Sequence, residues 1–210
     1  MKKSRFRFLL FCVVTFTFAQ SLCAQNAKEH FNSGLKNYKE GKYDEAIASF
    51  TEAIKIYPKH VEAYYNRALS HGKKGDYKNE ISDYTKLLQM TPKDADAVFN
   101  RGVAYFNAKQ YVAAALDFTN AIQLNPKDSL AYYNRALCFH KKKAVDKALA
   151  DYTKALQLNP KFAKGYYNRG MAHRSKGVHD KAKADLKKAA SLGFSAAKDS
   201  LKQYYKIDVK

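Results

Sequence analysis

The sequence has no tryptophan, few prolines and glycines, and too few cysteines for a disulfide framework. Only four prolines and nine glycines occur in 210 residues, so a turn-rich β architecture is not expected. Alanine, lysine and leucine are abundant instead, and these residues favour helices. The composition therefore predicts an all-α protein.

Motifs that carry catalysis or bind metals are also missing. The six histidines show no His-Glu-x-x-His spacing, and the glycines form no phosphate-binding loop. Neither a nucleophile elbow nor a pair of carboxylates placed for acid–base chemistry is present. We therefore expect no enzymatic activity, no cofactor and no metal ion.

Acidic residues are half as numerous as basic ones, which gives a formal net charge of +19. Long-range attraction would favour acidic proteins, anionic lipid or other polyanions as partners. A dispersed basic surface that only keeps the protein soluble explains the same composition.

The first 24 residues differ from the rest of the chain. Four basic residues stand between positions 2 and 7, and an acid-free apolar stretch follows from Phe8 to Ala19. This layout is typical of a secretory signal peptide, and the stretch is too short to span a bilayer comfortably. We expect cleavage after Ala24 and export to the periplasm or the medium, so nucleic acid is not an expected partner. An uncleaved anchor and a lipoprotein attached through Cys23 are the alternatives, although Leu22 is larger than the residue usual before a lipidated cysteine.

Removal of residues 1–24 would take away Cys12 and Cys23 and leave Cys138 alone. No disulfide could then form within the mature chain. Cys138 is expected to be a small buried residue rather than a reactive thiol.

A pattern of 34 residues repeats through most of the chain, because four prolines and four Asn-Arg pairs each recur at this spacing. The prolines set the register of five units. The prolines are Pro58, Pro92, Pro126 and Pro160, and the units are 27–60, 61–94, 95–128, 129–162 and 163–196.

Each unit predicts two helices that cross closely. A small residue in the first helix, such as Ala68, stands opposite a bulky residue in the second, such as Tyr84. Glycine occupies the turn between the helices in three units. Lys109 and Lys143 stand there in the third and fourth units, so those turns should be slightly strained or differently shaped.

Several short strings resemble the tetratricopeptide repeat family over residues 27 to about 196. They are AYYNRA (63–68 and 131–136), VFNRG (98–102), GYYNRG (165–170), DYTKAL (151–156) and LNPK (124–127 and 158–161). The resemblance implies a right-handed α-solenoid of five helix-turn-helix units. The fifth unit departs from the family pattern, because Gly193-Phe194 replaces the final proline.

A stacked array needs a cover at its last unit. Residues 197–210 are expected to supply a C-terminal capping helix and tail, with the helix over 195–206. Ala197, Leu201 and Tyr204 recur at helical spacing and should form its apolar side.

Four arginines are each followed sixteen residues later by an aspartate, whereas the first unit has Ser33 and Ser49 at these places. Their joint presence and joint absence predict part-buried ion pairs that fix the register of each hairpin more than they raise its stability. The pairs are Arg67–Asp83, Arg101–Asp117, Arg135–Asp151 and Arg169–Asp185.

A stripe of asparagines is the candidate binding site. In the resembling family the first helix of each unit lines the inner surface, and position six of that helix is always asparagine here. A carboxamide both donates and accepts, so a row of them could hold a peptide backbone of any sequence. Lysines at position thirteen would favour acidic side chains. We call these residues the asparagine stripe: Asn32, Asn66, Asn100, Asn134, Asn168, Lys39, Lys73 and Lys141.

Asparagine could instead be only a tolerated residue at that position. Position five is aromatic in every unit, which argues against the clamp of lysine and asparagine that some family members use for a terminal carboxylate. We expect these aromatic rings to pack between units. They are Phe31, Tyr65, Phe99, Tyr133 and Tyr167.

Two functional hypotheses follow. The first is a scaffold or adaptor that binds an extended peptide or partner protein, acidic by charge complementarity, in its groove in the periplasm or cell envelope. The second is a basic surface that binds anionic envelope polymers or the membrane surface. The sequence determines neither the partner nor the oligomeric state.

Overall fold

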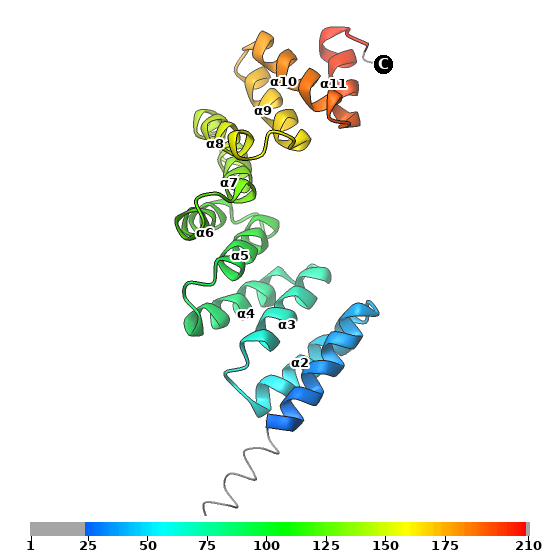
Figure 1. The fold of residues 1–210 in the computed structure, drawn as a ribbon, viewed down its shortest axis with the longest axis vertical. Helices are drawn as coiled ribbons and strands as arrows, with labels where there is room; N and C mark the ends of the chain where they lie inside the picture. The colour runs from blue at the N-terminus through cyan, green and yellow to red at the C-terminus, as the bar shows by residue number, and fades with distance from the viewer. Residues whose placement is uncertain (1–23, 209–210) are drawn as a thin grey trace, which may run out of the picture. The chain divides into compact units, whose positions relative to one another are not determined.

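The computed structural model describes residues 24–208, and all regular secondary structure in this range is helical (Figure 1). The predicted signal peptide lies outside the described residues except for Ala24. So do Cys12 and Cys23. The described chain divides into two compact units, one ending at Pro92 and the other beginning at Lys93.

The first compact unit contains two helical hairpins. A helix over residues 24–39 is followed by α2, and α3 is followed by α4, with α2 also packed on α3. The bounds are Tyr43–Ile56 for α2, Val61–Lys73 for α3 and Tyr77–Met90 for α4.

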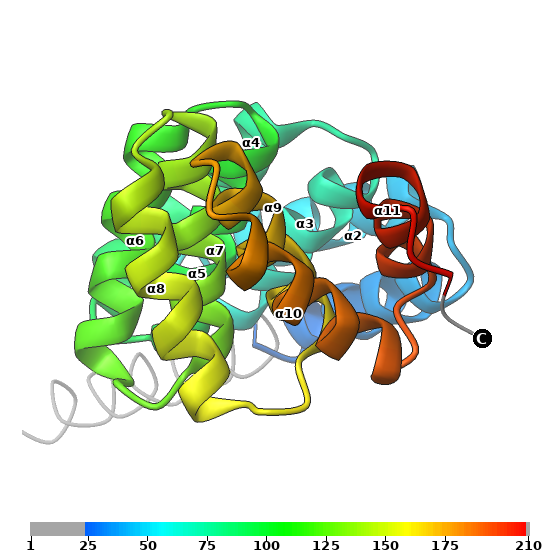
Figure 2. The ribbon, with the colours of Figure 1, turned by 90° about the horizontal axis from the view of Figure 1, so that it is seen from above.

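The second compact unit contains three hairpins and a final helix, and each helix packs on the next. The first helices α5 and α7 also touch one another. Seen from above, α6 and α8 lie along one side of this unit (Figure 2). The bounds are Ala95–Asn107 (α5), Tyr111–Leu124 (α6), Ser129–Lys141 (α7), Val145–Leu158 (α8), Ala163–Ser175 (α9), His179–Ser191 (α10) and Ser195–Tyr205 (α11).

Close crossing within each hairpin depends on the small residue of the first helix. A Cβ atom added to Gly102 would lie 2.9 Å from the ring of Phe118, and one added to Gly34 would lie 2.5 Å from the ring of Phe50. Phe50 and Phe118 are both fully buried. The small residues predicted at the crossing are therefore required by the aromatic rings that fill it.

Lysine adopts the left-handed conformation in two turns, as the sequence predicts. Lys109 and Lys143 each have φ of 60°, close to the 75° of Gly177 in the equivalent turn. Only glycine reaches this region without a steric penalty from Cβ, so both lysine turns are strained.

Replacing Lys143 with glycine should therefore stabilise the protein by about 1 kcal/mol, since the Cβ clash disappears but the unfolded chain gains some entropy. The midpoint of urea unfolding measures this. Gly177→Lys makes the opposite change in an equivalent turn and should lower the midpoint. An unchanged or lower midpoint for Lys143→Gly would contradict the strain.

Helix α11 covers the end of the array. Ala197 and Leu201 are buried against a cluster that includes Leu186 of α10. The placement of Tyr204 on this apolar side was wrong: its ring is 36% exposed and lies 3.5 Å from the guanidinium carbon of Arg174. Tyr205, four residues after Leu201, packs on the cluster instead.

Candidate functional site: the first helices of the repeats

The four predicted Arg–Asp pairs are formed, and each is bidentate. In every pair Nε and Nη2 of the arginine donate to the two carboxylate oxygens at 2.7–2.8 Å. The aspartates are only 4–7% exposed, so the charges are largely removed from water. The hydrogen bonds to Asp151 raise the pKa of the Arg135 guanidinium above its ordinary value.

A second partner of three of these arginines was missed at the sequence level. Nη1 of Arg135 donates to the hydroxyl of Thr119 in the preceding repeat at 3.1 Å, and Arg67 and Arg169 do the same. The signal was present, because threonine stands sixteen residues before each arginine. Arg67, Arg135 and Arg169 thus join consecutive repeats and are not free to bind a ligand. The threonines are Thr51, Thr85, Thr119 and Thr153.

The second compact unit holds three asparagines of the stripe, on α5, α7 and α9. Nδ2 of Asn134 donates to the carbonyl oxygen of Leu130 in its own helix at 2.8 Å. Nδ2 of Asn168 donates to the hydroxyl of Tyr133 at 2.6 Å, which joins α9 to α7. A carboxamide has two N–H groups and an acceptor oxygen, so each of these side chains keeps further hydrogen-bonding capacity.

The first compact unit holds the other two asparagines. Asn66 lies on α3 and donates to the carbonyl oxygen of Glu62 at 2.7 Å, as Asn134 does in its own helix. Asn32 lies on the helix over residues 24–39 and is exposed. The stripe therefore consists of two parts, one in each compact unit.

The lysines of the stripe lie at the surface. Lys39, Lys73 and Lys141 are exposed, and none of the three forms an ion pair with another residue in the range 24–208. Half-buried aliphatic residues, among them Leu69 and Leu137, lie one helical turn away at position nine. Each first helix thus presents an amide beside an apolar residue, with a free cation near the helix end in three repeats.

The aromatic rings at position five contact rings in their own hairpins, and Tyr133 also lies in one buried cluster with Ala172 of the next unit, so packing between units is confirmed for this residue. The ring of Phe99 lies 5.4 Å from that of Phe118, and the ring of Tyr133 lies 5.8 Å from that of Tyr152. The small crossing residue leaves room for two aromatic rings that pack at a tilt to one another. Burial raises the pKa of the Tyr133 hydroxyl to about 12, and the hydrogen bond from Asn168 lowers it only in part.

Reactive groups are not gathered in the described part of the chain. Cys138 is fully buried, and burial raises the pKa of its thiol to about 12, so it stays protonated and inert. Between residues 24 and 208 no three His, Cys, Asp or Glu side chains come together to hold a metal ion. In the same range no helix is both long and apolar enough to cross a bilayer.

These hairpins, with their periodic small residues and guanidinium links, define an all-α helical-repeat protein. Tetratricopeptide repeat models match residues 95–128, 129–162, 61–94 and 163–192, and a further TPR repeat model matches 34–75. The matches together span most of the chain, which therefore belongs to the tetratricopeptide repeat family.

Solved structures of other repeat proteins are similar over nearly their whole length. A crystal structure of MamA has 25% identity and a TM-score of 0.76, covering 89% of this chain and 98% of its own. MamA of Desulfovibrio magneticus RS-1 has 24% identity and a TM-score of 0.77, covering 81% and 96%. YrrB, described as a TPR protein with an unusual peptide-binding site, has 22% identity and a TM-score of 0.74, covering 89% and 97%. The comparison with curated proteins gave no match.

Proposed function

We propose that this protein is a non-catalytic scaffold or adaptor that binds an extended peptide or a partner protein through the asparagine stripe. The observation that carries the proposal is the amide at the same place of every first helix, together with the hydrogen-bonding capacity that Asn66, Asn134 and Asn168 keep after the one bond that each donates. The description of YrrB as a peptide-binding repeat protein supports the same use of the fold.

The chemistry of the stripe suits a polypeptide more than a small molecule. A second N–H and the carbonyl oxygen of Asn134 can pair with a peptide C=O and N–H, and Leu137 beside it excludes water from those bonds. The free ammonium groups of Lys73 and Lys141 favour acidic side chains on the bound segment. Hydrogen bonds to the peptide backbone would provide affinity for any sequence, and the lysines would provide a preference for acidic segments.

We further propose that the partner is met outside the cytoplasm, in the periplasm or cell envelope. This rests on the basic and apolar residues of positions 1–24, which have the layout of a signal peptide. The N-terminal residue of the protein purified from its native host tests it. A start at Gln25 supports export with cleavage, whereas a lipid on Cys23 would indicate an anchored form.

Replacing Asn66, Asn100 and Asn134 together with alanine should abolish binding of the natural partner and leave the helical content unchanged. The chain from Gln25 onward, immobilised and exposed to an envelope extract, captures candidates, and titration of each purified candidate then gives its affinity. Asn66 and Asn134 bond only within their own helices, so their loss does not unlink the repeats.

The matched control removes three carboxamides from the second helices. Gln89, Gln123 and Gln157 are exposed, and their replacement by alanine changes neither the charge nor the stripe. If both triple variants bind like the wild type, the stripe is not the site. Binding that ignores both sets of changes and falls steeply with salt would favour the basic-surface alternative.

A further inference from the structure

Two surface lysines reveal a recurring link between repeats. Lys74, just after α3, pairs with Asp44 near the start of α2, and Lys176, just after α9, pairs with Asp146 near the start of α8. In each case the aspartate precedes the lysine by thirty residues and lies in the preceding repeat. Both lysines are therefore paired with a carboxylate from the start of the preceding repeat's second helix.

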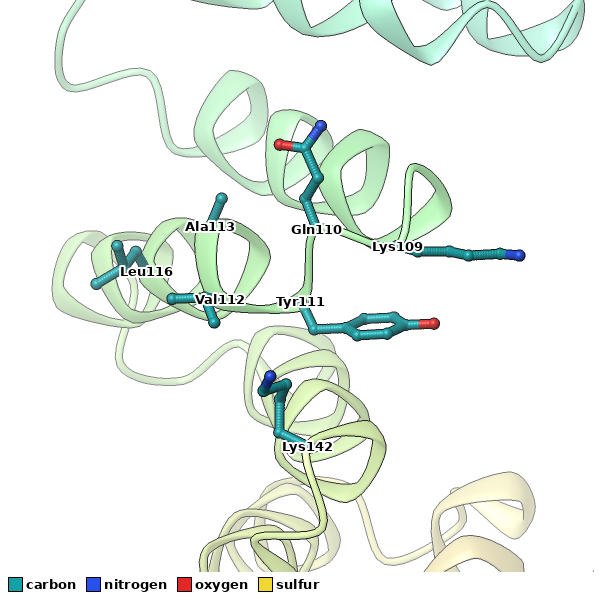
Figure 3. A pocket seen from close by; sticks show the side chains of 7 residues that line it. All are labelled: Lys109, Gln110, Tyr111, Val112, Ala113, Leu116 and Lys142. Atoms are coloured by element: carbon teal, nitrogen blue, oxygen red, sulfur yellow. The ribbon is translucent and has the colours of Figure 1, made fainter.

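Lys142 holds the same place after α7, but its carboxylate is missing. The residue thirty positions earlier is Val112, and Lys142 forms no ion pair with any residue between 24 and 208. Figure 3 shows the Lys142 side chain extending from the end of α7 towards Val112 on α6. The ammonium group of Lys142 thus lacks the carboxylate partner that the equivalent Lys74 and Lys176 have.

The outer face of α6 carries large aliphatic side chains at two positions where the other second helices carry charged or small residues. Val112 is 62% exposed and Leu116 63% exposed, and they stand one turn apart on the same side of the helix. Scattered exposed aliphatic residues are ordinary, but two neighbours beside an unpaired lysine form a patch. The equivalents of Val112 are Asp44, Lys78, Asp146 and Asp180, and those of Leu116 are Ala48, Ser82, Ala150 and Ala184.

A hollow between α6 and α7 lies under this patch. Its volume is about 350 Å³, and its floor is formed by apolar atoms of Ala115, Phe139 and Cys138, with Val112 and Leu116 at the edge. This size is within the range of small binding pockets, roughly 300–1,000 Å³. Lys142 is the only charged side chain among the residues that line it. Lys109 adds a second cation to the adjoining surface (Figure 3).

We propose that this α6–α7 hollow is a second docking surface, which takes a partner polypeptide with aliphatic side chains next to an aspartate or glutamate. The partner's carboxylate pairs with Lys142 as Asp44 and Asp146 pair with their lysines. Its aliphatic side chains cover Val112 and Leu116, which removes the exposed apolar area from water. The surface uses no residue of the asparagine stripe and does not depend on it.

The test selects phage-displayed random peptides on the chain from Gln25 onward, which contains all the described helices. A Val112→Asp variant serves for counterselection, because its new carboxylate occupies Lys142 from within. We expect enriched peptides to contain an acidic residue beside aliphatic ones. Synthetic copies should bind Val112→Asp and Lys142→Met about tenfold more weakly than the wild type, the size of a lost charge pair with its apolar contact.

Two controls separate this surface from other effects. Val178→Asp places the same new charge on another exposed valine, and it should bind the peptides like the wild type. The triple asparagine variant should also bind them normally, so that failure of the stripe and failure of the hollow are distinguishable. Circular dichroism verifies that every variant keeps its helices.

Three outcomes would overturn the proposal. The first is the absence of peptides that prefer the wild type over Val112→Asp, or enrichment of peptides without acidic residues. The second is a dimer seen by sedimentation velocity that Val112→Asp abolishes, because the occupant would then be a second copy of this chain. The third is binding to vesicles of phosphatidylcholine and phosphatidylglycerol that the same substitution removes, because the hollow would then face a membrane.

Discussion

Replacing Asp151 with alanine should lower the free energy of unfolding by about 3 kcal/mol, because it leaves a part-buried guanidinium without its carboxylate. The side chain of Arg135 is 19% exposed and is held by α7, by Asp151 of α8 and by Thr119 of α6. Water can therefore solvate the unpaired guanidinium of Arg135 only in part. Urea unfolding followed by circular dichroism measures the change.

The double variant Arg135→Met, Asp151→Leu separates the cost of an unpaired charge from the value of the pair. Apolar residues of similar volume often replace a buried ion pair with little loss, so the double variant should be markedly more stable than Asp151→Ala. Asp180→Ala breaks an exposed pair with Lys183 and should have little effect. A loss under about 1 kcal/mol for Asp151→Ala would show that the pair is weakly coupled to folding.

Glu80 should make the protein less stable as the pH rises, and Glu80→Gln should remove this dependence. Glu80 is 6% exposed, and its Oε2 has no hydrogen-bond partner among residues 24–208. Burial raises the pKa of Glu80 from 4.5 to about 7. The folded protein therefore keeps this proton at a pH where the unfolded chain has released it.

The direction of the effect follows from proton binding. Between pH 4.5 and about 7 the unfolded state binds fewer protons than the folded state, so stability falls as the pH rises through this window. The difference between the two pKa values corresponds to about 3 kcal/mol of folding stability. The protein has lost all of this stability once the pH is above about 7. Below pH 4.5 the group is neutral in both states and contributes no slope.

Urea unfolding at pH 5 and pH 8 tests this with wild type and Glu80→Gln. The variant should gain stability relative to the wild type on going to pH 8, by up to about 3 kcal/mol. Glu45→Gln, an exposed carboxylate on α2, controls for the general effect of removing a negative charge. Parallel pH profiles for wild type and Glu80→Gln would show that Glu80 ionises normally.

The periodic features of this chain were readable from the sequence because each is repeated. Spacing alone predicted the contact between Arg135 and Asp151, and the left-handed turn at Lys143 followed from glycine at the equivalent positions. A contact that recurs from repeat to repeat shows in the sequence as the same pair of residues at the same spacing. Thr119 also recurs at a fixed spacing, sixteen residues before Arg135. Threonine is common on helices, however, so the spacing did not single out this contact.

Features confined to one repeat could not be predicted in this way. Glu80 stands where the other second helices have Ala46, Ala114, Ala148 and Ala182. Its accommodation depends on Gly72, whose added Cβ would lie 2.7 Å from the Glu80 carboxyl group. Tyr133 contacts both Tyr152 of its own hairpin and Ala172 of the next one, and periodicity does not distinguish a contact within a hairpin from one between hairpins. The stripe itself stays a prediction, since internal hydrogen bonds of Asn66 and Asn134 are compatible with binding and with its absence.

The bonds from the guanidinium groups of Arg67, Arg135 and Arg169 to a hydroxyl one repeat earlier bear on how such a chain can lengthen. A duplicated copy of residues 61–94 would bring an arginine that can reach the threonine before it and a threonine for the arginine after it. A copy of residues 27–60 placed in the interior would bring Ser33 instead, and the row of cross-links would be interrupted there. Growth by duplication should therefore have drawn on the arginine-bearing modules, and arrays redesigned from this protein should be extended with them.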